Sequence, residues 1–344
     1  MDPIEKLRQW LNVSDELKQL YRIEDEIMKK GVLLINLGTP KLPTTEDVRQ
    51  YLKKFLSDSR VINMPAWKWQ PILNLMILPR RPQKSAKLYQ KIWSADHGSP
   101  LLYYTQQQTR LLQKKIPNCI VRYAMSYSEP EIPTVLKEME VLEVDQLTII
   151  PLYPQYSTTT VGSVVDQVNH FYIGQVKIPS LRIITDFCNY QPYVTAMAAK
   201  IEKEIATFKP DKLLFSYHGI PVDYVKKGDP YADRCHLTTK LVMSQITQRV
   251  SYSETFQSRF GPNEWLKPAT SETLKLLPTK GSKRVLVVAP SFVSDCLETL
   301  YELNIENKQA FTENGGTAFK LISALNDDPV FIDILQRLVS EVRG

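Results

Sequence analysis

The segment GVLLINLGTP, residues 31–40, decides the fold class, because it has the pattern of a strand that is buried on both faces. Its apolar run ends at Gly38 and Pro40, two residues that favour a turn. Similar apolar runs occur at 119–126, 146–152, 182–187, 212–217 and 284–290, and helical patterns lie between most of them, for example at 130–142, 192–207 and 235–249. Such strands, alternating with helices, predict an α/β fold built on parallel sheets.

The length of 344 residues predicts about two domains. We expect two similar α/β halves, 31–175 and 176–344, each a parallel sheet flanked by helices. The last helix is expected to pack back on the first half. Residues 1–30 carry Trp10, Leu11, Leu17 and Leu20 at helical spacing and predict a helical extension.

Several classes of protein are excluded by what the sequence lacks. It has 12 glycines, and none of them forms a G-x-G-x-x-G or a G-x-x-x-x-G-K-[ST] motif, which argues against Rossmann dehydrogenases and P-loop NTPases. Its 4 cysteines are far apart and form no C-x-x-C motif, which argues against disulfides and structural zinc. We expect a cytoplasmic protein, since no apolar run reaches the roughly 18 residues of a membrane span and the N-terminus resembles no signal peptide.

The excess positive charge is confined to one segment. The net charge is +6, but residues 49–91 contain ten Lys or Arg and one acid, a local +9, so the rest of the chain carries 6 − 9 = −3. We therefore expect no nucleic-acid partner. Within this segment, residues 64–82 (MPAWKWQPILNLMILPRRP) combine apolar and cationic side chains. That pattern fits a membrane-interface helix or a site for an amphiphilic acid, and an ordinary core-facing helix fits it equally well.

The residues that follow the predicted strands are unusual. In parallel sheets the ligand crevice lies at the carboxyl ends of the strands. There, His218 follows the strand 212–217 in a tight turn, where its imidazole can accept a proton or bind a metal. Residues 126–127 and 153–157 add hydroxyls and aromatic rings, but no Lys or Arg. This set predicts a large, flat, mostly apolar ligand, although a simple turn with a hydroxyl cap also explains the threonines after 157.

Four carboxylates follow the strand 284–290. Asp295, Glu298, Glu302 and Glu306 are spaced by three, four and four residues, which places them on one face of a predicted α-helix. Such a stripe can pass a divalent cation along or relay protons. A solvated acidic face is the alternative.

The chain resembles the ferrochelatase family in ten ordered segments between Gly31 and the C-terminus. These segments are LLINLGTP, FLSDSRVI, the RRP stretch, HGSPL, MSYSEP, PLYPQYSTTTVGS, LLFSYHGIP, KGDPY, FQSRFGPNEWLKPAT and PSFVSDCLETLYELNIE. The resemblance implies a chelatase-type fold of two similar Rossmann-like halves with the active-site cleft between them. It also implies an enzyme that inserts Fe²⁺ into protoporphyrin IX. The reaction releases two protons and gives protohaem, the last step of haem biosynthesis.

The resemblance also implies roles for individual residues. His218 and Glu298 match the catalytic and metal-binding pair, one as proton acceptor and the other as metal donor, and which does which stays open. Asp295, Glu302 and Glu306 match a path for protons or metal. The positions implied to contact the porphyrin are Leu37, Arg80, Tyr89, Ser99, Met125, Ser126, Tyr127, Tyr153, Gln155, Tyr156, Ser157 and Trp265.

The chain departs from some family members in three ways. Those members have His at the position of Cys296 and Arg at that of Ser126, which puts a metal path through Cys296 in doubt. Others hold a [2Fe–2S] cluster on C-terminal cysteines, but no cysteine follows Cys296, so we expect no such cluster. Ferrous iron is expected as a substrate, with no tightly bound cofactor.

Other functions stay open at this point. Within the same fold, the substrate could be coproporphyrin or another tetrapyrrole. From another class, a non-catalytic haem or metal carrier is possible. The resemblance further implies peripheral membrane contact through residues 64–82, and it leaves open whether the protein is a monomer or a homodimer.

Overall fold

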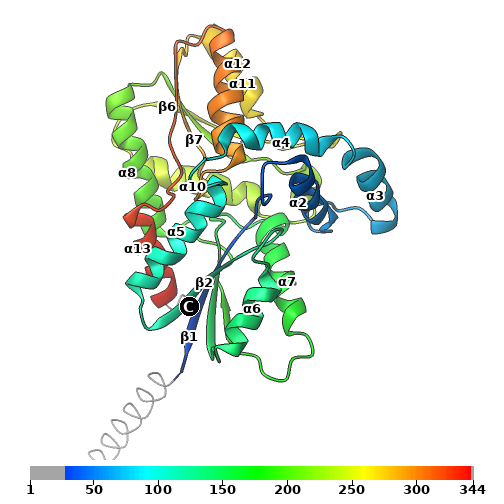
Figure 1. The fold of residues 1–344 in the computed structure, drawn as a ribbon. Coiled ribbons are helices and arrows are strands. Elements are labelled where there is room, and N and C mark those ends of the chain that lie inside the picture. Colours follow the sequence, from blue (N-terminus) through cyan, green and yellow to red (C-terminus); the bar gives the residue numbers. More distant parts are fainter. Residues whose placement is uncertain (1–27, 342–344) are drawn as a thin grey trace, which may run out of the picture.

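Two four-stranded parallel sheets form the centre of the protein, as described by a computed structural model that covers residues 28–341 (Figure 1). The first sheet has the order β2-β1-β3-β4, with β1 at Lys30–Asn36, β2 at Cys119–Met125, β3 at Gln146–Pro151 and β4 at Ser180–Ile183. The second has the order β6-β5-β7-β8, with β5 at Lys212–His218, β6 at Ser251–Gln257, β7 at Arg284–Val288 and β8 at Ala318–Leu321. Because the two orders are equivalent, the prediction of two similar α/β halves is confirmed.

Helices cover both sheets. Those that precede β4 are α2 (Thr45–Ser57), α3 (Ala66–Ile72), α4 (Arg81–Ile92), α5 (Pro100–Lys115), α6 (Ile132–Val141) and α7 (Ser163–Tyr172). Those that follow it are α8 (Gln191–Phe208), α9 (Val222–Lys226), α10 (Tyr231–Gln245), α11 (Thr270–Leu276), α12 (Lys308–Glu313) and α13 (Pro329–Ser340). Three π-helical segments, η1 (Leu73–Ile77), η2 (Thr158–Gly162) and η4 (Glu298–Asn307), and a 3₁₀ turn, η3 (Pro278–Lys280), complete the elements. Within residues 28–341 no helix has the length and apolarity that crossing a bilayer requires.

The first sheet continues past residue 175, where the sequence pattern placed the end of the first half. Strand β4 pairs in parallel with β3, with Gln146 opposite Ser180. The division at 175 is therefore too early, because α8 is the first element that follows the complete sheet. The expected strand at 182–187 begins earlier and ends at Ile183, since it lies at the sheet edge and is only half-buried. The expected helical extension at 1–30 falls almost entirely outside the described residues.

The two halves share one apolar core. A single cluster of fully buried side chains includes Leu34 of β1, Tyr193 of α8, Phe215 of β5 and Leu335 of α13. The last helix, α13, packs on both α5 and α8. Burial of large apolar side chains at about 25 cal/mol per Å² makes such a shared core the main force that holds the halves together. The geometry between the two sheets is therefore fixed by packing.

Glycines form the turns that follow the equivalent strands β1 and β5. Gly38 has φ +108°, and a Cβ there would lie 2.7 Å from the Ser128 side chain. A Cβ on Gly219 would lie 2.8 Å from the carbonyl oxygen of Gln257. Both positions thus exclude larger residues. Each turn places the residue before its glycine, Leu37 or His218, at the corresponding point of its sheet.

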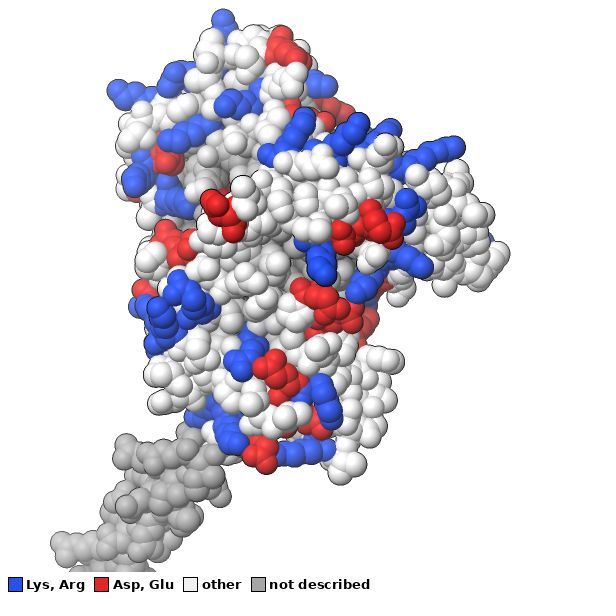
Figure 2. Space-filling view, in the orientation of Figure 1, with Lys and Arg blue, Asp and Glu red and all other residues white. Residues whose placement is uncertain are grey.

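A projecting segment, residues 64–82, includes α3 and η1 and ends in the first turn of α4 (Figure 1). Trp67, Leu75 and Met76 are 74%, 77% and 60% exposed, whereas Leu73 is fully buried. Figure 2 shows this projection as mostly uncharged surface with Lys and Arg beside it. The segment therefore anchors itself by a few buried residues and presents its other apolar side chains to the solvent.

Candidate active site

His218 ends strand β5 and is held by its own turn. Its Nδ1–H donates a hydrogen bond to the carbonyl oxygen of Gly219 at 2.7 Å. A carbonyl oxygen only accepts, so the proton resides on Nδ1 and Nε2 keeps its lone pair in the neutral ring. Burial lowers the pKa of His218, and the neighbouring Glu298 carboxylate acts in the opposite direction. His218 is therefore a neutral base at physiological pH.

Glu298 begins the π-helix η4 and lines a pocket between the two halves. The same pocket is lined by Leu37, which follows β1, by Tyr89 of α4 and by Ser99, which precedes α5. The structure thus brings together four of the predicted site residues from distant parts of the sequence. Cys296 also lines this pocket, and burial raises the pKa of its thiol well above the ordinary value. The thiol is therefore protonated at neutral pH and is a poor metal ligand.

The sequence patterns missed two residues of this site, Tyr51 and Arg81. Tyr51 lines the pocket, and its ring meets Tyr89 edge-on at 6.5 Å. Arg81 is half-buried, and its guanidinium lies 5.0 Å from the centre of the Phe260 ring. Burial lowers the pKa of Arg81, and Tyr51 and Tyr89 oppose that shift. Arg81 is therefore a half-buried cation in the electrostatic field of two tyrosines that line the pocket.

Arg80, the predicted contact, is exposed. Helical spacing could have distinguished the two arginines, because Arg81 lies eight residues before the buried Tyr89 on the same face of α4.

The acidic stripe adopts a π-helix rather than the predicted α-helix. Insertions of this kind are rare and are frequent at functional sites. Asp295 lies before the helix and is buried, accepting hydrogen bonds from Thr299 at 2.9 Å and Asn326 at 2.7 Å. Burial raises the pKa of Glu302 to about 7. Glu306 is exposed.

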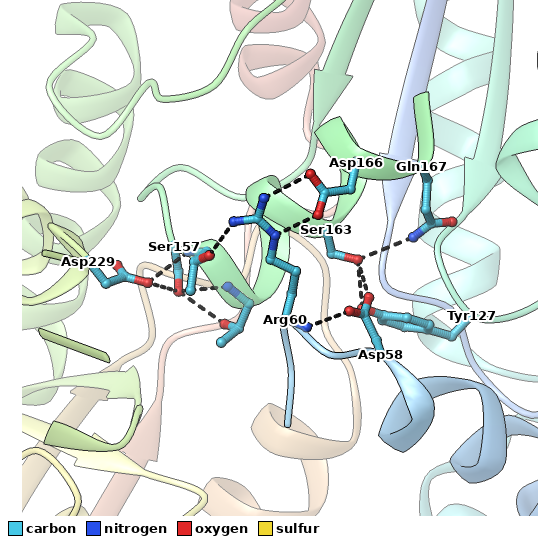
Figure 3. Close-up of polar contacts among 10 residues, drawn as sticks. Asp58, Arg60, Tyr127, Ser157, Ser163, Asp166, Gln167 and Asp229 are labelled. Carbon is cyan, nitrogen blue, oxygen red and sulfur yellow. Dashed lines mark hydrogen bonds and ion pairs between the residues drawn. The ribbon is translucent and has the colours of Figure 1, made fainter. Parts of the chain in front are cut away.

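The predicted segment 125–127 runs beside Leu37. The Ser126 N–H donates to the carbonyl oxygen of Asn36 at 2.9 Å, and the Tyr127 N–H donates to that of Leu37 at 3.0 Å. Met125 is fully buried beneath this edge. The Tyr127 hydroxyl donates to the Asp58 carboxylate at 2.7 Å, within the polar network of Figure 3. The backbone of this segment thus supports the pocket, while the Tyr127 hydroxyl belongs to the network.

Residues 155–157 connect the two halves. The Ser157 hydroxyl donates to Asp229 at 3.0 Å, and the Gln155 amide donates to Thr238 at 3.0 Å (Figure 3 shows the first contact). The backbone N–H of Tyr156 donates to Asp186 at 3.3 Å. Tyr153 is half-buried, and burial raises its pKa, with Ser126 acting in the opposite direction. Glu298 and Cys296, which line the pocket, also raise the pKa of Tyr153.

A comparison with protein families identifies the chain. The sequence profile of the family described as Ferrochelatase matches residues 29–343. The chain belongs to the ferrochelatase family. As a ferrochelatase, it is an enzyme that inserts iron into a porphyrin, and the iron is a substrate.

Curated relatives agree with this assignment. The chain is 48% identical over 312 residues to the coproporphyrin III ferrochelatase of Enterococcus faecalis, covering 91% of this chain and 99% of the relative. It is 46% identical over 315 residues to the ferrochelatase of Edwardsiella ictaluri, covering 91% and 98%.

Solved structures share the fold at much lower identity. SirB from Bacillus subtilis, solved with Fe³⁺, matches with a TM-score of 0.53 at 10% identity, covering 91% of this chain and 96% of that one. CbiX matches with a TM-score of 0.51 at 12% identity, covering 91% and 100%. The chelatase-type fold expected for this ferrochelatase is therefore confirmed.

Trp265, the remaining predicted contact, lies beside the turn that carries His218. It is buried and borders a second pocket with Gly219 and Gln257. Its ring centre is 5.2 Å from that of Phe260. In this ferrochelatase the segment after β6 therefore runs from the turn that carries His218 to the Phe260 ring, which lies under the Arg81 guanidinium.

Proposed function

We propose that this ferrochelatase inserts Fe²⁺ into protoporphyrin IX, with His218 as the proton acceptor and Glu298 as the group that meets the metal. The observation that carries the assignment is the hydrogen bond from His218 Nδ1–H to Gly219, because it leaves Nε2 as a lone-pair base. Metallation removes two pyrrole protons, and a neutral imidazole suits that task near pH 7. Glu298 is a carboxylate, whose oxygens attract a divalent cation.

The pocket residues fit a flat ligand with acid groups at one edge. Leu37, Tyr51 and Tyr89 supply apolar and aromatic surface for the ring. Ser99 is 3% exposed, and its hydroxyl makes no capping bond at the start of α5, so a carboxylate could bind it and the helix N-terminus. Arg81 is the cation that a propionate would pair with. Gripping the periphery provides the binding energy that bends the ring toward the metallation geometry.

Coproporphyrin III is the second candidate substrate. The relatives in Enterococcus faecalis and Lactococcus lactis carry that substrate in their names, at 48% and 47% identity. The exposed apolar side chains of segment 64–82 favour the less polar protoporphyrin IX, since a more acidic porphyrin has less need of apolar surface at its entrance.

Anaerobic metallation assays with both porphyrins test this proposal. Purified protein is mixed with Fe²⁺ and either protoporphyrin IX or coproporphyrin III, and the absorption bands are followed. We expect turnover of both, with the higher kcat/KM for protoporphyrin IX. A higher kcat/KM for coproporphyrin III would make that porphyrin the substrate. Tight porphyrin binding with no turnover of either porphyrin would support a non-catalytic haem or metal carrier.

We also propose a cytoplasmic protein without a [2Fe–2S] cluster that touches a membrane surface through segment 64–82. The support is the position of the exposed apolar residues beside a cationic stretch. Absorption of the purified protein in the visible region tests the cluster, and bands typical of [2Fe–2S] would overturn that part.

A further inference from the structure

Glu302 contacts one residue with both of its carboxylate oxygens. Its Oε1 accepts a hydrogen bond from the backbone N–H of Ser258 at 2.6 Å, and its Oε2 accepts one from the Ser258 hydroxyl at 2.5 Å. A carboxylate held in this two-pronged way has a fixed orientation. Ser258 follows β6 directly, so this contact joins the π-helix η4 to the end of an edge strand.

The anchored position is conformationally unusual. Ser258 has φ +64°, in the left-handed region that side chains other than glycine rarely adopt. Such a conformation persists where surrounding contacts hold it in place. Here the two hydrogen bonds that Ser258 donates to Glu302 do so. A third bond adds to them, because the Gln257 side chain donates to the backbone carbonyl oxygen of Glu298 at 3.0 Å.

The segment that leaves Ser258 contacts Arg81, the proposed partner of a propionate. Two residues further on, Phe260 lies under the Arg81 guanidinium at 5.0 Å and next to Trp265 at 5.2 Å. Arg81 belongs to α4 in the first half, whereas Phe260 belongs to the second. The conformation imposed at Ser258 therefore sets where the ring meets the cation across the cleft.

We infer that Glu302 is a positioning residue for porphyrin binding, which acts by holding Ser258 and thereby the Phe260–Arg81 contact. Both of its oxygens accept hydrogen bonds from Ser258, which fixes the carboxylate at the end of β6. Glu306, one turn further on, is exposed and has no such partner among the contacts described. This inference rests on the proposed porphyrin pocket.

The amide variant separates the two roles. Glu302→Gln keeps an oxygen for the Ser258 N–H and an NH₂ group that can donate to the Ser258 hydroxyl, but it has no charge. A positioning residue tolerates this change, whereas a metal or proton carrier does not. Glu302→Ala removes both contacts, and Ser258→Ala removes one of them. Steady-state kinetics are measured with porphyrin and Fe²⁺ varied separately.

We expect Glu302→Ala to raise KM for the porphyrin by about tenfold, as loss of a bond to a charged group implies, with little change in KM for Fe²⁺. Glu302→Gln should stay within about threefold of wild type, and Ser258→Ala should be intermediate. In the double variant, Ser258→Ala should add less than its own effect, because the two residues act through one contact. Glu313→Ala removes an exposed carboxylate of α12 outside the site, and as the control it should leave KM for the porphyrin unchanged.

Other outcomes overturn the inference. If Glu302→Gln is as impaired as Glu302→Ala, or if the loss falls on KM for Fe²⁺, Glu302 acts on the metal or the proton. Thermal unfolding of each variant identifies a fold defect, and the Gln and Ser258 variants keep the test valid if Glu302→Ala does not fold. Absence of turnover in the wild type would instead overturn the proposed function.

Discussion

The His218 imidazole donates its Nδ1 proton to the carbonyl oxygen of the next residue, Gly219, at 2.7 Å. This bond fixes both the tautomer and the orientation of the ring. Gly219 is itself fixed, because its N–H donates to the carbonyl oxygen of Gln257 at 2.8 Å and a Cβ would have no room. The base of the reaction is thus positioned by backbone groups of two neighbouring strands.

The pH dependence of the reaction follows from the burial of His218. Burial lowers its pKa below the ordinary value of 6.5, so the ring stays neutral and basic as the pH falls to 6.5. We expect kcat/KM to be level around neutral pH and to decline only below 6.5, when the imidazole becomes protonated. Steady-state rates in buffers whose pH ranges overlap measure this decline of kcat/KM on the acid side. An acid limb with its midpoint above 6.5 would contradict the assignment.

The two adjacent arginines of α4 should differ in their effect on porphyrin binding. Arg81→Ala removes the half-buried cation, and we expect the porphyrin Kd to rise by about tenfold or more. Arg80→Ala removes an exposed cation at the next position and should have a clearly smaller effect. Quenching of protein fluorescence by the porphyrin gives both constants. An equal rise in the porphyrin Kd for both variants, or a larger rise for Arg80→Ala, would assign the propionate contact to Arg80.

The network of Figure 3 predicts a stability difference between two aspartates. Asp58 accepts hydrogen bonds from the Tyr127 and Ser163 hydroxyls, whose residues are both buried. Asp58→Asn should lower the free energy of unfolding by about 1–3 kcal/mol. Asp166 pairs with Arg60 at 2.6 Å, with side chains 50% and 40% exposed, so Asp166→Asn should cost less than about 1 kcal/mol. Urea unfolding measures the loss of unfolding free energy in each variant. A larger loss for Asp166→Asn than for Asp58→Asn would contradict this interpretation.

The projecting segment predicts salt-sensitive membrane binding. Trp67 and Leu75 are the most exposed large apolar side chains of segment 64–82. The wild type should co-sediment with anionic vesicles at low salt and less at high salt, because ions screen the attraction to nearby Lys and Arg. Replacing both residues by Ser should reduce binding at either salt. The idea is lost if the wild type binds vesicles at neither salt.

The strands that the sequence predicted best are those buried on both faces. The run at 212–217 matches β5, and the run at 146–152 matches β3, because a strand without solvent contact needs apolar residues throughout. The edge strands β6 and β8 lack this pattern and are missed: β6 reads SYSETFQ, with Tyr252 and Phe256 as its only apolar residues, and β8 has four residues. Tertiary pairing, rather than local sequence, makes these segments strands.

The candidate site was predictable where a motif ends a strand. His218, Leu37 and Glu298 lie at the edge where the parallel topology places them. The partners that come from helices were harder to predict, since Arg81 and Tyr51 depend on how α2 and α4 pack. The engagement of Glu302 with Ser258 could not be foreseen, because it depends on a π-helix and on a left-handed backbone conformation.

Single-turnover metallation by His218→Ala and Glu298→Ala, beside the wild type, tests the central claim most directly. Anaerobic protein is loaded with protoporphyrin IX and mixed with Fe²⁺, while fluorescence quenching confirms that each variant still binds the porphyrin. The account predicts that both variants bind the porphyrin within a few-fold of wild type and lose metallation by at least about a hundredfold. Metallation at the wild-type rate by either variant would contradict it.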